Sequence, residues 1–192
     1  MMTLSEKCRA VILLAAPVAI AVHATTLEQM DLAQLARAAQ VVARVRCVSS
    51  ESRRDSGHIW TFTRFSVVEA LQGSPGATLT VRLPGGREGH LMENVEGVPR
   101  FSPGEETILF LERPRLPQQA DGDEWSVTAW GEGTFRIERD ARTGRESVTQ
   151  DSSRMPVFDR ATRTFRAQGI ARMPMPDFLA RLAAARKEGT FK

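Results

Sequence analysis

The stretch 87–103 holds the residues that come nearest to a functional site in this sequence. His90 lies three residues before Glu93, and arginines stand at both ends of the stretch. An imidazole among carboxylates can serve as a general base, but a single histidine lacks the multi-ligand spacing of a zinc centre. A long irregular stretch inside a compact domain is typical of a binding loop. We therefore predict a binding loop without metal or cofactor. Its contact residues are Arg87, His90, Glu93 and Arg100.

Elsewhere in the sequence, no motif for nucleophilic catalysis or phosphate binding is complete. Cys47 lies in an alternating apolar run, where a small buried side chain is expected, with a reactive thiol or an intermolecular disulfide as the alternative. Residues 84–89 (PGGREG) are rich in glycine but lack the Lys-Ser/Thr pair of a phosphate loop. No G-x-S-x-G nucleophile elbow is present. These observations favour a non-catalytic binding module. The alternative is a secreted hydrolase that uses His90 or acidic residues.

The three tryptophans allow two interpretations. Trp60, Trp125 and Trp130 could line a sugar or peptide groove, although filling of the core is favoured. A nucleic-acid binder needs exposed aromatic side chains on a basic face. We therefore do not expect nucleic acid as a partner, and expect an unidentified protein or cell-envelope component instead.

The first 24 residues have the three parts of a cleavable bacterial signal peptide. Lys7 and Arg9 give a positive segment, residues 10–22 are uncharged, and Ala24 precedes the predicted cleavage site. The apolar run is shorter than the roughly 20 residues that a membrane helix needs. A buried N-terminal helix is the alternative. We predict a secreted or periplasmic protein whose mature chain begins at Thr25.

Cleavage removes Cys8, so that Cys47 is the only cysteine of the mature chain and no internal disulfide can form. Residues 25–192 are long enough for a single domain with its own core. Within them, the segment 151–192 carries nine Lys or Arg against four Asp or Glu. This basic segment could contact an anionic surface, and a solvated arginine-rich surface is the alternative.

The pattern of apolar residues predicts an α+β fold that is mostly β. Asp31 and Gln34 form a capping box for a short N-terminal helix, and Pro176 suits the first turn of a C-terminal helix. Residues 49–57 read as a polar loop. Alternating or β-branched runs predict strands at 41–47, 59–71, 78–83, 107–112, 125–130 and 133–139. We expect a small antiparallel barrel or sandwich of five or six strands.

The stretch from Ala39 to Leu111 resembles uncharacterised secreted bacterial β-barrel proteins. The resemblance lies in the runs VVARVRC, EALQG, LTVRLPGG and FSPGE, followed by an apolar strand. More distantly, the same order is similar to the netrin-like, OB-type barrel of tissue inhibitors of metalloproteinases. Those inhibitors grip the protease zinc with an N-terminal cysteine, whereas the mature chain here begins at Thr25. The resemblance therefore implies an OB-like barrel and does not imply inhibition of metalloproteinases.

Overall fold

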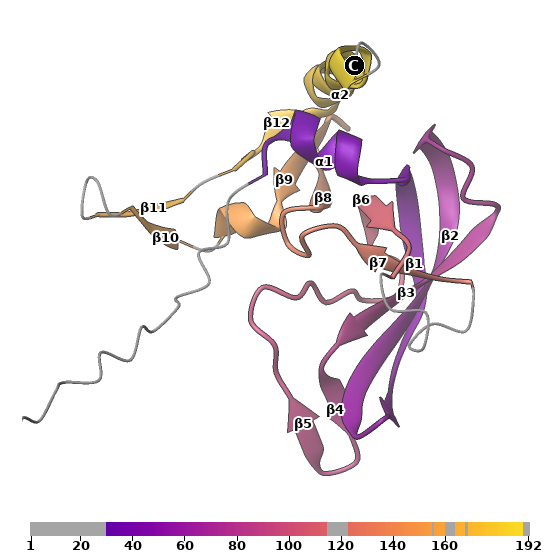
Figure 1. The fold of residues 1–192 in the computed structure, drawn as a ribbon. Coiled ribbons are helices and arrows are strands. Elements are labelled where there is room, and N and C mark those ends of the chain that lie inside the picture. The colour runs from indigo at the N-terminus through magenta and orange to yellow at the C-terminus, as the bar shows by residue number, and fades with distance from the viewer. Residues whose placement is uncertain (1–29, 115–122, 155, 160–163, 168, 190–192) are drawn as a thin grey trace, which may run out of the picture.

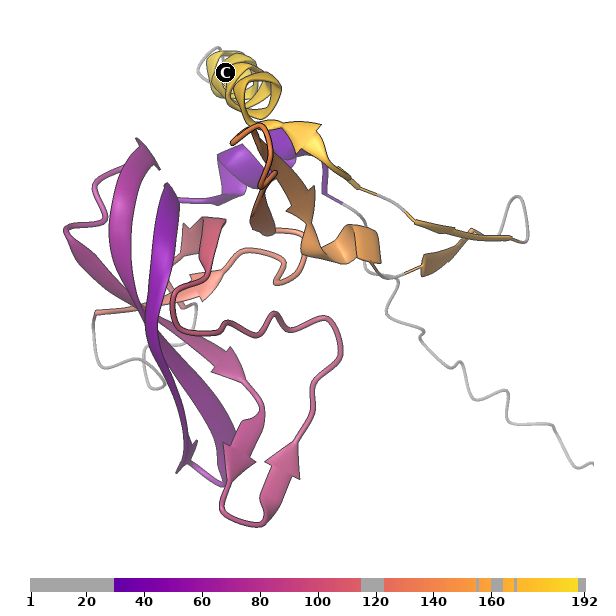
Figure 2. The same cartoon turned by 180° about the vertical axis from the view of Figure 1, so that it is seen from behind.

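The structure is a computed structural model that describes residues 30–114, 123–154, 156–159, 164–167 and 169–189 (Figure 1). The predicted signal peptide and its cleavage site lie outside these residues. Both helices lie at one end of the molecule and the β4–β5 hairpin lies at the other, as both views show (Figures 1 and 2). The helical elements are α1 (Leu32–Ala38), the 3₁₀ turn η2 (Asp151–Arg154) and α2 (Met175–Gly189). The strands are β1 (Val41–Asp55), β2 (His58–Gln72), β3 (Thr78–Pro84), β4 (Gly86–Glu88), β5 (Leu91–Glu93), β6 (Glu106–Glu112), β7 (Glu124–Val127), β8 (Thr134–Arg139), β9 (Glu146–Gln150), β10 (Pro156–Asp159), β11 (Thr164–Ala167) and β12 (Met173–Pro174).

Both predicted helices are confirmed, and the first begins as its capping box requires. The Asp31 carboxylate accepts the Gln34 N–H at 2.7 Å, and the Gln34 side-chain oxygen accepts the Asp31 N–H at 2.7 Å. These reciprocal bonds satisfy donors that a helix N-terminus otherwise leaves without partners. Helix α1 buries Leu35, and α2 buries Phe178 and Leu182 in the same apolar cluster.

The prediction of an α+β fold that is mostly β is confirmed, but the expected barrel or sandwich of five or six strands is wrong. Eight strands form one mixed sheet in the order β1-β2-β3-β7-β6-β8-β9-β12. Strand β1 pairs with β2 on one side and, through Val41 to Arg46, with β6 on the other. The pairings β1-β2-β3-β7-β6 therefore return to β1, and β8, β9 and β12 continue the sheet from β6. Among the described strands, the one parallel pair joins Thr80 and Val81 of β3 to β7.

The residues 49–57, which were predicted as a polar loop, instead form the last part of β1 and the turn that joins it to β2. Hydroxyl pairs join the two strands here, from Ser50 to Thr63 at 3.0 Å and from Ser52 to Thr61 at 2.9 Å. Cross-strand hydroxyl pairs stabilise an antiparallel sheet without an apolar face. Because no apolar alternation marks this part of the strand, the sequence pattern indicated a loop.

Strand β7 ends earlier than expected, at Val127, because the chain turns sharply after it. Ala129 and Trp130 have φ values of 49° and 48°, which a strand cannot contain. The Trp130 carbonyl accepts the Gly133 N–H at 3.1 Å and the Thr134 hydroxyl at 3.0 Å. A Cβ on Gly133 would lie 2.1 Å from the Thr128 carbonyl oxygen, so this turn requires glycine.

Two apolar clusters form the core, one on each face of β6. Leu109 and Leu111 belong to the cluster inside the circuit of strands, whereas Ile108 and Phe110 belong to the cluster beneath the helices. Burial of both faces explains why β6 is a continuous apolar run. Cys47 lies in the first cluster at 2% exposure, which confirms the expected buried side chain, and burial raises the pKa of its thiol.

Arg44 joins three strands through two carboxylates. Its guanidinium contacts Glu106 on β6 and Glu146 on β9, with an Nη2–Oε1 distance of 2.8 Å to Glu146. Arg139 binds Glu146, and Arg46 binds Glu106. The hydrogen bond from Arg44, together with that from Arg139, lowers the pKa of Glu146 to about 2. The bonds from Arg46 and Arg44 lower the pKa of Glu106.

These lowered pKa values predict a loss of stability in acid. In the unfolded chain a glutamate titrates near pH 4.3, so the ion pairs stabilise the fold above about pH 5 and lose this effect as the pH falls toward 2. We expect Glu146→Gln to lower the free energy of unfolding by about 1 to 2 kcal/mol at pH 7, a modest loss because the Glu146 side chain is 17% exposed and solvent partly screens its ion pairs. Urea unfolding between pH 7 and 2.5 measures this. The curve of Glu146→Gln should be flatter than that of the exposed control Glu96→Gln, and parallel curves would contradict the expectation.

Candidate binding surface

The stretch predicted as an irregular loop begins with a short hairpin. Strands β4 and β5 pair in antiparallel fashion, with Glu88 opposite Leu91, and a two-residue turn of Gly89 and His90 joins them. Gly89 has a φ of +59°, as such tight turns require. Each strand is only three residues long, which is too short for sequence periodicity to reveal. His90 is therefore an exposed residue of a hairpin turn.

Glu93 and Arg100 hold the base of this hairpin in place. The Glu93 carboxylate accepts the N–H of Ile59 at 2.9 Å and lies 3.6 Å from His58 Nδ1. Arg100 donates from Nη1 to the Thr61 hydroxyl at 3.0 Å, and that hydroxyl donates to the Gly85 carbonyl at 2.6 Å. Both residues thus contact the β1–β2 hairpin, and they act as anchors.

Gly86 brings the hairpin close against the inner side of the sheet. A Cβ at this position would lie 2.3 Å from Ser52 Oγ and 2.5 Å from Thr61 Oγ1. On the other side, the Glu88 carboxylate accepts the Arg54 N–H at 3.3 Å. Gly86 thus fixes the base of the hairpin, and Glu88 ties the end next to the turn to β1.

Of the four predicted contact residues, the structure leaves two on the exposed part of the hairpin. Arg87 donates from Nε to the Gly89 carbonyl at 3.2 Å, within the hairpin itself, and His90 is in the turn. Glu93 and Arg100 contact β2 instead, so that the described contacts do not bring the four residues together. The predicted site thus divides into two parts. Glu93 and Arg100 form its anchored base, and Arg87 and His90 belong to the exposed tip at the Gly89-His90 turn.

Sequence reasoning missed the apolar residues of this tip. Leu91 is 51% exposed and Met92 is 76% exposed, and both follow the turn directly. An adjacent Leu-Met pair within a stretch of glycines and charges was the available signal. As successive residues of a strand, Leu91 and Met92 project from opposite faces of the hairpin, so that a partner would cover both only by enclosing the tip.

Arg136, which the sequence did not single out, holds the chain that leads back from the hairpin. Its guanidinium pairs with Asp151 at 2.7 Å and with Glu105, and donates to the Arg100 carbonyl at 2.8 Å. It also lies 4.8 Å from the centroid of the Phe101 ring. These contacts tie residues 100–105 to β8 and so to the core.

The tryptophans divide between the core and the outer face of the sheet. Trp125 is 8% exposed in the core, as expected, and Trp130 packs partly buried against the same cluster. Trp60 lies outside it, with the Arg82 guanidinium 4.1 Å from its ring centroid. Arg82 also binds Asp55 at 2.6 Å. The core interpretation is therefore wrong for Trp60, because an arginine rather than the core covers its ring.

The outer face of β2 holds an open hollow of about 370 Å³ beside these residues. Arg53 covers the Phe62 ring at 3.8 Å and lies 3.9 Å from the Glu124 carboxylate. Since guanidinium groups already stack on Trp60 and Phe62, these ring faces are not open platforms for a base or a sugar.

The remaining functional chemistry is sparse in the part of the chain that the structure describes. No group of three or more His, Cys, Asp and Glu side chains there could hold a metal ion. None of the described helices is long and apolar enough to span a bilayer. No protein-family model matches this chain, and a search of curated proteins finds no match. The function is therefore inferred from the geometry of the described residues.

Proposed function

We propose that this chain is an exported, non-catalytic binding module that contacts a protein or another envelope component through the tip of the β4–β5 hairpin. The observation that carries the proposal is the exposure of Leu91 and Met92 on a hairpin whose base is anchored. Covering these two side chains removes apolar surface from water, which is favourable. Arg87 and His90 beside them supply the polar rim that contact surfaces usually have.

The anchors matter because they reduce the entropy that binding would cost. A free loop must be ordered when a partner binds, whereas a hairpin held by Glu93 and Arg100 is ordered beforehand. Methionine adds an adaptable apolar contact, since its unbranched chain fits surfaces of varied shape. The tip therefore combines a rigid support with a flexible contact side chain.

Export and the OB-type resemblance stay predictions. The three-part signal at residues 1–24 supports export. The circuit β1-β2-β3-β7-β6 supports the resemblance in its strand order, within a sheet that is larger than such a barrel. The hydrolase alternative requires His90 and carboxylates in one pocket, and the exposed hairpin turn does not supply that arrangement.

Removal of the apolar tip tests the proposed function. We expect Leu91→Ser with Met92→Ser to weaken binding at least tenfold, because two buried apolar side chains contribute on the order of 1.4 kcal/mol or more. The mature chain 25–192 is first used to capture and identify a partner from the envelope fraction of the native host. The dissociation constant of the purified pair is then measured by calorimetry.

The matched control is Val48→Ser with Val68→Ser, which removes two valines that are each 50% exposed on β1 and β2. This variant should bind like the wild type, and all three proteins should unfold at similar urea concentrations. If the tip variant bound normally, or if the valine variant lost binding instead, the hairpin would not be the contact surface.

A further inference from the structure

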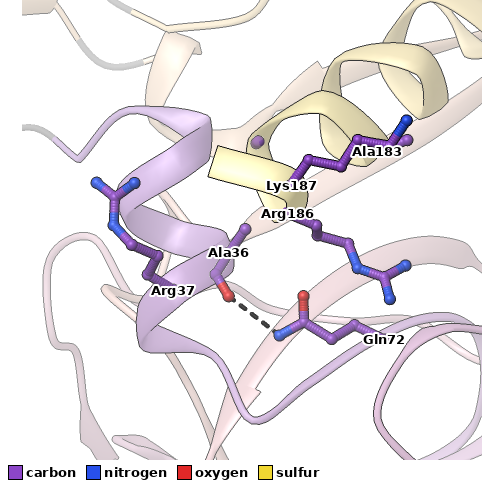
Figure 3. Close-up of a pocket in the computed structure, with 7 residues that line it drawn as sticks. Ala36, Arg37, Gln72, Ala183, Arg186 and Lys187 are labelled. Carbon is purple, nitrogen blue, oxygen red and sulfur yellow. Dashed lines mark hydrogen bonds between the residues drawn. The ribbon is translucent and has the colours of Figure 1, made fainter. Parts of the chain in front are cut away.

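The C-terminal parts of the two helices meet at a groove whose described lining consists of cationic and neutral side chains. This hollow of about 750 Å³ lies between α1 and α2, beside the end of β2 (Figure 3). Arg37, Arg186 and Lys187 line it together with Gln72 and three alanines. None of the lining residues that the structure describes is acidic. The groove therefore favours an anionic ligand.

The cations of the groove have a structural alternative, because positive side chains also stabilise helix C-termini. At α1 this need is already met by Gln72, whose amide nitrogen donates to the Ala36 carbonyl at 3.0 Å and to the Ala39 carbonyl at 2.8 Å. Arg186 donates to the Leu71 carbonyl of β2 at 2.7 Å. Arg37 and Lys187 are exposed, and within the described part of the chain neither has an ion pair or a side-chain hydrogen bond.

The positions of these charges indicate the form of the ligand. In Figure 3, Arg37 extends from α1 on one side of the groove, whereas Arg186 and Lys187 extend from α2 on the other. Charges that diverge in this way cannot enclose one small anion, as a phosphate-binding loop does. They can each meet a separate anionic group on a surface. The apolar side chains that line the groove are alanines, which are small, so the charged groups dominate its chemistry.

We propose that this groove is a docking site for a membrane surface that carries anionic phospholipid headgroups. Arg37 and Lys187 supply the attraction, and Arg186 holds α2 against β2. This inference goes beyond the proposed function, because the groove and the β4–β5 hairpin lie at opposite ends of the molecule (Figures 1 and 2). A basic side chain near an anionic bilayer strengthens binding about fivefold.

Co-sedimentation of the mature chain with vesicles tests the site. The vesicles contain either 30 mol % phosphatidylglycerol in phosphatidylcholine or phosphatidylcholine alone. Wild-type protein should bind the anionic vesicles at low salt, bind them less at high salt, and not bind the neutral ones. Arg37→Gln with Lys187→Gln should weaken the binding about 20- to 30-fold, since two charges are lost.

The control is Arg64→Gln with Arg142→Gln, which removes two exposed arginines that do not line the groove. It should bind nearly as the wild type does, and Leu91→Ser with Met92→Ser should also bind vesicles normally. Equal binding by the groove variant and the control would overturn the proposal. So would loss of vesicle binding at a few millimolar inorganic phosphate but not at matched ionic strength of chloride, because the site would then select a small free anion. Urea unfolding confirms that the variants are folded.

Discussion

Replacing Arg136 with alanine is expected to lower the free energy of unfolding by about 3 to 5 kcal/mol, the range for breaking a buried ion pair from one side. The Arg136 side chain is only 12% exposed and pairs with both Asp151 and Glu105. Its loss leaves two carboxylates that are partly removed from water without their counter-charge. It also removes the hydrogen bond to the Arg100 carbonyl and the contact with the Phe101 ring. Urea denaturation at pH 7 followed by tryptophan fluorescence measures the effect.

Arg139 on the same strand supplies the matched control. Its side chain is 66% exposed and binds Glu146, so Arg139→Ala should cost less than about 1 kcal/mol, as exposed ion pairs usually do. Similar losses for the two variants would show that Arg136 is no more than a surface residue. If the expectation holds, the position of residues 100–105, which lead back from the β4–β5 hairpin, depends on Arg136. This residue is distant in sequence from the turn of that hairpin.

Phe178→Ala is also expected to lower the free energy of unfolding by about 3 to 5 kcal/mol. Phe178 is fully buried, and its ring centroid lies 4.9 Å from that of Phe135, which is 5.4 Å from that of Phe110. These three rings join α2 to β8 and β6. The truncation leaves a cavity at the centre of the cluster and weakens the docking of the helix. Amide exchange in α2 should accelerate in the same variant, since local opening becomes easier.

Leu179→Ala, at a partly buried neighbour on the same helix, is the comparison for this truncation. It should cost clearly less than the loss of Phe178, because less apolar surface returns to water and no closed cavity forms. An equal cost, or unchanged exchange in α2 of Phe178→Ala, would mean that the helix is held mainly by other contacts.

Local chemistry made several features predictable. The capping box of α1 depends on two side chains three residues apart, and both bonds form as expected. The apolar run at 107–112 indicated a strand, and β6 is indeed a strand that is buried on both faces. By contrast, the second half of β1 was missed because its serines pair with threonines of β2 and not with a core. Neither the hydroxyl pairs nor the sheet that they hold is visible in apolar periodicity.

In the candidate site, too, some features were predictable from the local sequence and others depend on tertiary contacts. The sequence indicated where a binding loop would lie, because glycines and charges interrupt the strand pattern between residues 87 and 103. It could not distinguish anchors from contact residues, since that difference arises when Arg100 reaches Thr61 and Glu93 reaches Ile59 across the fold. The exposure of Leu91 and Met92 likewise depends on the fold, since none of the described elements covers them.

By itself, then, the sequence determined the mostly β character, the two terminal helices, the place of the candidate loop and the predicted export signal. Each depends on neighbours within about ten residues, through caps, turns and apolar periodicity. The tertiary structure decided which strands share the large mixed sheet, which arginine holds the returning loop, and which cations line the groove between α1 and α2. These depend on pairings between distant segments, whose free energy comes from burial and charge contacts that form only when the chain is folded.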